Sequence, residues 1–159
     1  MPPELVTLLR RDHVDLQSEL TRLLDPTLSL HELRTALDGV RLGLTAHAEA
    51  EDIVLAPLEN VPSLQRLVSE SRAAHMAQES ALATLVTMRL GTPAWRDRAH
   101  HLRDLVRFHA AREEAELIPG LAAHPDYNRL AGAFATERLR QLAMLQPSVP
   151  VYIAQLAAM

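Results

Sequence analysis

The chain contains an internal repeat whose two copies lie 62 positions apart. Residues 47–57 read HAEAEDIVLAP and residues 109–119 read HAAREEAELIP, so a histidine, the glutamate four positions after it and a closing proline coincide. The same shift carries His13 onto His75. Each copy therefore has one histidine followed by a His-x-x-x-Glu motif, and any fold for this chain must present that unit twice. A helical hairpin repeated in tandem meets this requirement.

Prolines, glycines and N-capping residues predict where the helices of this fold begin and end. Ser29 and Glu32 form a capping-box pattern, and the Gly-Thr-Pro sequence at 91–93 joins a helix-ending glycine to a new helix start. Further breaks contain proline, at 25–26, 57–63 and 119–120. We expect helices at 3–24, 30–56, 63–90 and 93–118. Their short connections predict an all-α, up-down-up-down four-helix bundle.

We assign residues 1–121 to the bundle and residues 122–159 to a separate C-terminal part. Within that part, Arg129 to Leu145 is predicted as an additional helix, and an apolar tail at 151–156 follows two prolines. Apolar surface of this kind is normally covered. We expect the C-terminal helix and tail to pack on the bundle or on a second copy of the chain, which would make the protein a homodimer.

Composition excludes several classes of function. The chain lacks cysteine, which removes disulfides, thiolate metal sites and cysteine nucleophiles. Its net charge of −4 provides no basic surface for nucleic acid. No apolar run is long enough to predict a membrane span, and the first residues lack the pattern of a secretory signal. We therefore expect a cytoplasmic protein that binds neither nucleic acid nor a membrane.

Helical periodicity places the histidines and glutamates of the repeat on the inner faces of the predicted helices. Residues four apart lie on one face about one turn apart, so each His-x-x-x-Glu motif presents both side chains together. Apolar residues share these faces, as Leu9 and Leu16 do beside His13. The positions fall at similar heights along the bundle, so six side chains should meet in its middle: His13, His47, Glu51, His75, His109 and Glu113.

Six such side chains predict a metal site. A buried carboxylate without a counter-charge is costly, and no basic residue shares these inner faces. A hydrogen-bonded core histidine is the ordinary alternative for one residue, but it does not explain four that are related by a repeat. One divalent ion would offset both carboxylates, whereas two ions would use all six ligands. Because imidazole with carboxylate suits iron, and tetrahedral zinc would leave two groups unused, we predict two iron ions.

With Asp12 ahead of the first histidine, these motifs resemble the hemerythrin family, specifically its HHE cation-binding type, over about residues 8–121. The resemblance implies a four-helix bundle with a non-haem di-iron centre. It implies that Glu51 and Glu113 bridge the two irons. It further implies two histidine pairs that each hold one iron: His13 with His47, and His75 with His109.

The chain departs from the oxygen-carrying members of that family in two places. They have a second histidine one turn after the third-helix histidine, where this chain has Glu79, and they end in His-x-x-x-x-Asp. The departures resemble microbial and F-box-type relatives and disfavour reversible oxygen transport. The expected function is binding or sensing of a small ligand such as O₂, NO or peroxide. The alternative is a di-iron enzyme that reduces peroxide or oxidises Fe(II), or an iron-handling protein.

The repeat is imperfect one turn after its first histidine, where Gln17 corresponds to Glu79. Glu79 is predicted to add an anionic oxygen ligand to the iron held by the second pair of histidines. Gln17 is neutral and a poor ligand, so the iron held by the first pair should be one ligand short. We predict that small molecules bind at this open position, where the Gln17 amide can hydrogen-bond a bound oxygen species.

The other acidic and histidine residues are given outer positions. Asp52 and Glu114 directly follow the two glutamates of the repeat and are expected to be solvated or to contact the ligands from outside. The remaining histidines are expected at the surface: His31, His100, His101 and His124.

Overall fold

The computed structural model describes residues 4–146, and every regular element within that range is helical. The long helices are α1 (Leu5–Leu23), α2 (Leu30–Leu55), α3 (Gln65–Thr87), α4 (Pro93–Arg112) and α6 (Tyr127–Leu145). Three short segments join them: the 3₁₀ turn η1 (Ala56–Asn60), the π turn η2 (Glu113–Leu117) and α5 (Ile118–Ala122). The prediction of an all-α chain is confirmed. The apolar tail at 151–156, and with it the predicted dimer contact, lies outside the described residues.

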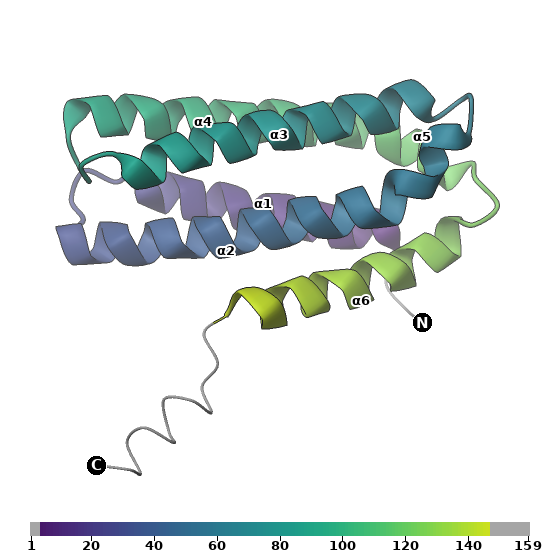
Figure 1. The fold of residues 1–159 in the computed structure, drawn as a ribbon, viewed down its shortest axis with the longest axis horizontal. Helices are drawn as coiled ribbons and strands as arrows, with labels where there is room; N and C mark the ends of the chain where they lie inside the picture. The colour runs from purple at the N-terminus through teal and green to yellow at the C-terminus, as the bar shows by residue number, and fades with distance from the viewer. Residues whose placement is uncertain (1–3, 147–159) are drawn as a thin grey trace, which may run out of the picture.

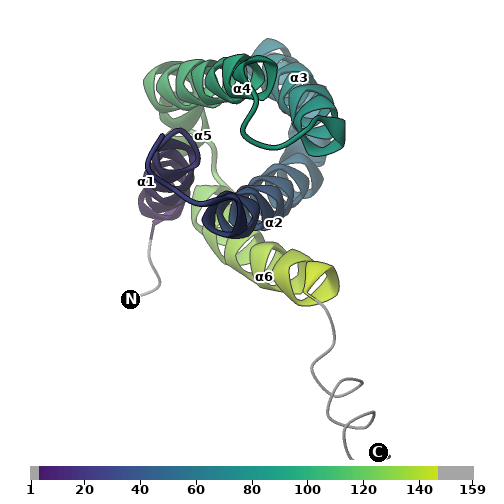
Figure 2. The same ribbon diagram turned by 90° about the vertical axis from the view of Figure 1, so that its left-hand side faces the viewer.

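Helices α1 to α4 form an up-down-up-down bundle in which each helix is antiparallel to the next (Figure 1). Viewed along the bundle, they stand at its four corners in chain order, and α4 closes the ring against α1 (Figure 2). Helix α6 lies outside this ring, packed on α2 and also touching α1. Within residues 4–146, no helix is long and apolar enough to cross a membrane.

Local sequence signals set the starts of α2 and α4. The Ser29 hydroxyl accepts a hydrogen bond from the Glu32 backbone at 3.2 Å, and the Glu32 carboxylate accepts one from the Ser29 backbone at 2.8 Å, which confirms the predicted capping box. Thr92 caps α4 by accepting a hydrogen bond from the Trp95 backbone at 3.3 Å. The turn before it needs Gly91, whose φ of 76° is favourable only without a Cβ.

Two prolines related by the repeat affect their helices in different ways. Proline lacks an N–H donor, and its ring clashes with the carbonyl four residues earlier in an α-helix. Before Pro57 the chain leaves α2 at Leu55 and tightens into the 3₁₀ turn η1. Before Pro119 the chain instead widens into the π turn η2 and continues as α5 to Ala122. The π turn accommodates the proline, so the helical path runs past the predicted end at residue 118.

Two apolar clusters fill the bundle, one on each side of a polar layer. The first packs Trp95 among leucines of all four bundle helices, and the second packs Phe134 of α6 among residues such as Leu5 and Leu117. Each fully buried leucine or phenylalanine contributes about 1.5–3 kcal/mol. Because the clusters fix the helices at both ends, the side chains of the polar layer between them are held close together.

Candidate metal centre

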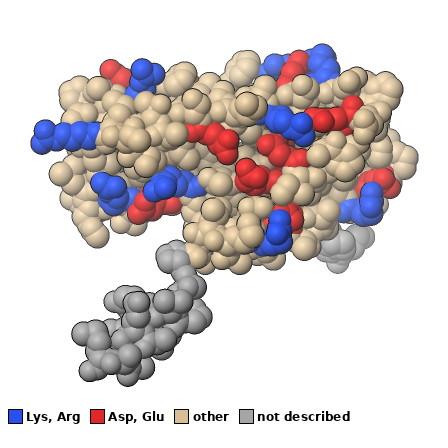
Figure 3. Space-filling view, viewed as in Figure 1, with Lys and Arg blue, Asp and Glu red and all other residues tan. Residues whose placement is uncertain are grey.

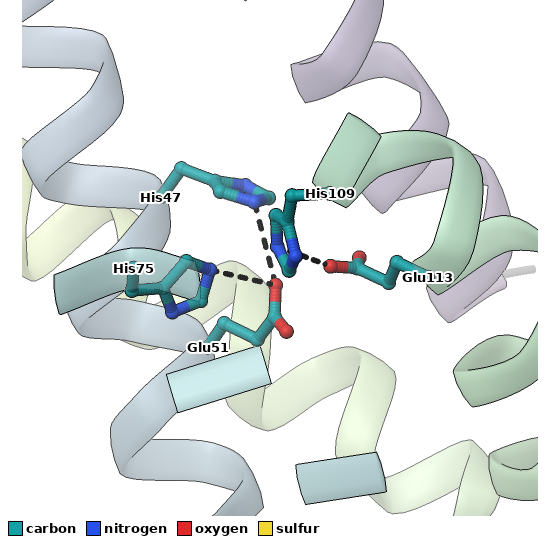
Figure 4. Close-up of side chains that lie close together, drawn as sticks. All are labelled: His47, Glu51, His75, His109 and Glu113. Carbon is teal, nitrogen blue, oxygen red and sulfur yellow. Dashed lines mark ion pairs between the residues drawn. The ribbon is translucent and has the colours of Figure 1, made fainter. Parts of the chain in front are cut away.

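The polar layer consists of four histidines and two glutamates. They come from α1 (His13), α2 (His47 and Glu51), α3 (His75), α4 (His109) and η2 (Glu113). None is more than 6% exposed. Figure 4 shows five of them, with imidazoles and carboxylates directed toward one another. One ligand atom from each of these five lies within 4.8 Å of all the others. The structure thus brings together the six side chains that the sequence placed in mid-bundle.

The Glu51 carboxylate lies between imidazoles of two helices. Its Oε2 is 3.3 Å from Nε2 of His47, one turn earlier on α2, and 3.8 Å from Nε2 of His75 on α3. The other oxygen, Oε1, accepts a hydrogen bond of 2.7 Å from the hydroxyl of Ser71. The carboxylate is therefore fixed on its outer side and turned toward the histidines on its inner side.

Glu113 occupies the corresponding position in the second copy of the repeat. Its Oε2 is 2.9 Å from Nε2 of His109, and its Oε1 is 3.3 Å from Nε2 of His13. The histidine rings pack edge to face in pairs, with centroids 5.3 Å apart for His13 and His47 and 4.7 Å apart for His75 and His109. Each carboxylate therefore reaches one imidazole of each ring pair.

The inner atoms of this layer are buried and have no hydrogen-bond partner among the described residues. They are Nε2 of all four histidines, Oε2 of Glu51 and both carboxylate oxygens of Glu113. An unpaired buried polar group costs about 1–3 kcal/mol, and more when it is charged. Seven such atoms around one point are costly unless something binds them. Imidazole nitrogen and carboxylate oxygen are accepted ligands of divalent transition metals, so the donor set fits a metal ion or a pair of ions.

Three of the four rings are oriented from outside by a carboxylate on Nδ1. The contacts are His13 with Glu114 at 3.0 Å, His75 with Asp52 at 2.8 Å and His47 with Asp12 at 3.1 Å. A carboxylate on Nδ1 fixes the tautomer that leaves Nε2 free and makes that nitrogen a stronger metal ligand. Of the two roles expected for Asp52 and Glu114, the structure shows contact with the histidines from outside.

His109 is the exception. The shift of 62 positions carries Asp12 onto Ala74, whose methyl group cannot accept a hydrogen bond. Ala74 and His109 instead line a cavity of about 60 Å³ that also touches Glu113 and Arg112. The second copy of the repeat therefore has a small void where the first copy has a carboxylate.

Arg138 and Ser71 also contact this site, and no pattern in the sequence predicts either contact. Arg138 of α6 lies with its Nε 2.7 Å from Oδ1 and 2.8 Å from Oδ2 of Asp12. Ser71 corresponds to Leu9 in the first copy of the repeat, so comparison of the two copies does not mark Ser71 as a site residue. By contrast, contact from outside is one of the two roles that the sequence predicts for Asp52 and Glu114, which the repeat superimposes. No pattern links Arg138 to Asp12, because the contact depends on how α6 docks.

Without a metal, the layer is held together by ion pairs. Burial lowers the pKa of His47, but the hydrogen bond with Asp12 and the negative charge of the nearby Glu51 outweigh burial and raise this pKa to about 10. Burial raises the pKa of Glu113, but the imidazoles beside it, that of His109 first, hold this pKa well below its usual range. At neutral pH the metal-free layer therefore contains an ionised carboxylate and a protonated His47. A metal ion that binds there displaces a proton.

Comparison with known protein families matches residues 4–121 to the hemerythrin HHE cation binding domain. The chain belongs to this family. The predicted resemblance is confirmed, and the buried histidine and glutamate layer of this hemerythrin-like domain is where it could hold a cation. No curated protein and no solved structure gives a match. The matched region runs from α1 into α5 and leaves α6 outside the hemerythrin-like domain.

Glu79 does not lie in the hemerythrin-like centre. Its side chain is exposed, whereas that of its neighbour Gln78 is 1% exposed. The buried stripe of α3 passes through Ser71, His75, Gln78 and Leu82, so the inward position after His75 comes three residues later and not four. The prediction that Glu79 faces the metal centre is therefore wrong, and the second pair of histidines gains no extra carboxylate from it.

Gln17 lies beside His13 along a groove of about 690 Å³ between α1 and α4. Its amide nitrogen is buried and unpaired within the described part of the chain, and so are both amide atoms of Gln78. Helices α1 and α3 run opposite to α2 and α4, so a residue one turn after His13 or His75 lies on the far side of the rings from Glu51 and Glu113. Two unpaired amides therefore face the side of the histidine layer that the carboxylates leave open.

The remaining histidines lie away from the layer. His31, His100 and His101 are exposed. His124 is half-buried in the turn before α6, where its Nδ1 accepts a hydrogen bond of 3.2 Å from the Asp126 backbone. These placements agree with the surface positions expected from the sequence.

Proposed function

We propose that this hemerythrin-like protein binds two iron ions in its histidine layer and takes up a small ligand, such as dioxygen, nitric oxide or peroxide, at an open metal position. The observation that carries the proposal is the convergence of seven buried, unpaired nitrogen and oxygen atoms. Six residues exceed the needs of one closed tetrahedral zinc site. Mixed imidazole and carboxylate ligands suit iron.

Charge supports two divalent ions over one. Five carboxylates surround the rings: Glu51, Glu113, Asp12, Asp52 and Glu114. Arg138 offsets one of these negative charges, whereas Arg10, 3.8 Å from Glu114, is 60% exposed and screened by water. With neutral imidazoles, the formal charge is minus four, which two divalent cations balance. A single ion would leave two negative charges uncompensated in a largely buried site.

The positions of the two glutamates support a shared site. Glu51 and Glu113 each reach one imidazole of the His13 and His47 pair and one of the other pair. We infer that each pair of rings holds one ion and that the carboxylates lie between the ions. Acidic side chains also gather in the middle of the face that α2 and α3 present (Figure 3), where they favour the approach of a cation.

The side of the histidine layer opposite the glutamates is the better place for a small ligand. A bound iron ion would act as a Lewis acid and could change its oxidation state. The groove beside His13 leads to this side, and Gln17 and Gln78 can each donate a hydrogen bond to a ligand held there. Burial of an otherwise unpaired Gln78 amide is costly, and a ligand or water in this space would satisfy it.

Binding is favoured over turnover by the chemistry of these two amides. Peroxide reduction requires a group that delivers protons to the departing oxygen. An amide can donate a hydrogen bond, but it neither releases nor takes up a proton in the neutral range. We therefore favour a ligand-binding or sensing protein over the alternative of a peroxide-reducing or Fe(II)-oxidising enzyme.

Anaerobic reconstitution with Fe(II) tests the metal part of this proposal. We expect binding to saturate at two ions per chain and expect near-ultraviolet absorption of an oxo-bridged pair after oxidation. Saturation at one ion, or no binding, contradicts the proposal. Replacing the exposed His100 or His101 by alanine provides a matched control that should retain both ions. Catalytic consumption of peroxide by the loaded protein would favour the enzyme alternative.

A further inference from the structure

Helix α6 lies outside the hemerythrin-like match, yet it reaches the metal centre. The match ends at residue 121, and α6 spans Tyr127–Leu145. From α6, the Arg138 side chain extends to Asp12 of α1, with Nε 2.7 Å from Oδ1. Asp12 is 5% exposed and holds Nδ1 of His47 at 3.1 Å. Three side chains from α6, α1 and α2 thus form one continuous hydrogen-bonded path.

Arg138 has a specific task in this path. Asp12 is buried, and it must remain ionised and correctly turned to accept the hydrogen bond of His47. The guanidinium, 32% exposed at the edge of the bundle, supplies the only full positive charge that the described residues place on Asp12 apart from an imidazole. A charge-assisted hydrogen bond of this kind is about twice as strong as a neutral one and is directional. Arg138 therefore fixes the carboxylate that fixes the ring.

A second contact from α6 reaches the same ring. Phe134, one turn before Arg138, is 1% exposed and packs edge-on against His47, with ring centroids 6.0 Å apart. Helix α6 therefore determines the position of His47 both through the carboxylate on its Nδ1 and through a packed aromatic edge. Neither contact would remain if α6 left the bundle.

The second copy of the repeat shows what the centre looks like without such support. There Ala74 replaces Asp12, and a cavity of about 60 Å³ lies next to His109. The two equivalent histidines of one metal centre thus differ in this respect: His47 is held by α6 through Asp12, and His109 is not. If α6 only covered the bundle, it would need no ion pair next to one of these two histidines.

We propose that Arg138 is a positioning residue of the metal centre, and that docking of α6 and metal binding are coupled through the path from Arg138 through Asp12 to His47. This inference rests on metal binding in the layer but not on the identity of the small ligand. Coupling of this kind is reciprocal. The factor by which docked α6 strengthens metal binding equals the factor by which bound metal suppresses the opening of α6. Helix α6 is therefore the part of the molecule that responds to metal occupancy.

The test compares Arg138→Gln with the parent protein, with Arg138→Lys and with Arg140→Gln. Arg140 lies on the same helix and pairs with Glu137, not with Asp12, so it is the matched control. For each protein, the dissociation constant for Fe(II) is measured anaerobically by competition with a chelator. Hydrogen exchange of the α6 backbone amides is measured with and without Fe(II).

In the parent and in Arg140→Gln, Fe(II) should slow the exchange of the α6 amides. Loss of a direct outer partner of a metal-bound histidine typically costs about 10–100-fold in affinity, and Arg138 acts one step further away, so we expect Arg138→Gln to weaken Fe(II) binding by about three- to tenfold. Slowing of α6 exchange by Fe(II) should shrink by the same factor. Arg138→Lys, which keeps the charge, should restore part of both effects.

Each remaining result counts against a different claim. If Arg138→Gln speeds α6 exchange equally with and without Fe(II), and Fe(II) binds as tightly as in the parent, Arg138 merely holds the helix and the coupling is refuted. If Arg140→Gln behaves like Arg138→Gln, the effect is a general one of charge on α6, and the specific path is refuted. If the parent itself binds no Fe(II), the metal-binding proposal fails before this inference is reached.

Discussion

Substitution of Ala74 by aspartate adds the outer carboxylate that the second copy of the repeat lacks. In the first copy, Asp12 lies 3.1 Å from Nδ1 of His47. Ala74 occupies the equivalent position, and the cavity of about 60 Å³ that it shares with His109 provides space for a new side chain. We therefore expect the new carboxylate to accept a hydrogen bond from Nδ1 of His109.

The magnitude follows from comparison with the existing partners. Loss of such a partner costs about 10–100-fold in metal affinity. Arg112 lines the same cavity but already pairs with Glu70 and Glu116, so it should hold the new carboxylate less firmly than Arg138 holds Asp12. We therefore expect a smaller gain, about three- to tenfold, or about 0.7–1.4 kcal/mol. The metal-free protein should become less stable, because the added negative charge lies next to Glu113 and near Glu70, and Arg112, which lines the same cavity, is already paired with Glu70.

Chelator competition and thermal melting, with and without metal, measure the two opposite effects. Ala74→Asn is the control for shape, because it fills the cavity without adding a charge. Ala77→Asp is the control for charge, because residue 77 is exposed on the same helix. The reasoning is refuted if Ala74→Asp binds metal no more tightly than the parent, or if Ala74→Asn gains as much affinity.

Three further predictions concern the ligands, the open side and pH. Glu113→Ala, or His47→Ala, should lower metal content and abolish stabilisation by metal. In the parent, bound metal should stabilise the folded protein by about 4 kcal/mol when the free metal concentration exceeds Kd about a thousandfold, which corresponds to roughly 8–16 °C in Tm. A Tm that chelation leaves unchanged would argue against a buried site. Gln17→Glu should keep two irons while weakening azide or nitric oxide binding. Glu79→Gln, on the exposed side of α3, should change neither the iron content nor the binding of these ligands. If Gln17→Glu binds the ligands as tightly as the parent, Gln17 does not lie at the ligand site. Because the pKa of His47 is raised from 6.5 to about 10 in the metal-free protein, its stabilising contribution is complete below pH 6.5 and is lost as the pH rises through about 10. Metal binding at pH 7–8 should accordingly release protons and tighten as the pH rises, and calorimetry in buffers of different ionisation enthalpy would show zero proton release if this is incorrect.

The histidine layer could be predicted from the sequence because two periodicities agree there. The repeat identifies the positions, and the helical period turns His47 with Glu51, and His109 with Glu113, to the same face. The prediction for Glu79 is wrong because Gln17, its partner in the repeat, lines a groove, and the repeat does not require both residues to lie on the same face of their helices. On α3 the buried stripe steps by three residues after His75, and one position rotates a side chain by about 100°.

For Asp52 and Glu114 the sequence predicts either solvation or contact with the ligands from outside, but it does not predict which histidine each one reaches. Whether Asp52 reaches His75 depends on the rotation of α2 against α3, and whether Arg138 reaches Asp12 depends on where α6 docks. Packing of distant segments decides both contacts, and a local pattern holds no information about it. The sequence does not predict the π turn at Glu113, because Pro119 indicates the end of a helix, whereas the chain widens before this proline and continues as α5.

Each helical hairpin provides a carboxylate that orients a histidine of the other hairpin, so neither hairpin has a complete metal centre by itself. Asp52 of the first hairpin orients His75 of the second, and Glu114 of the second orients His13 of the first. A chain severed at Pro62, in the connection between η1 and α3, would leave the second hairpin with Glu114 but without His13, the ring that Glu114 supports. The severed pieces should bind metal tightly only after they recombine. Two identical hairpins that met face to face would exchange the same supports, so the arrangement is also what a fused, duplicated dimer would inherit.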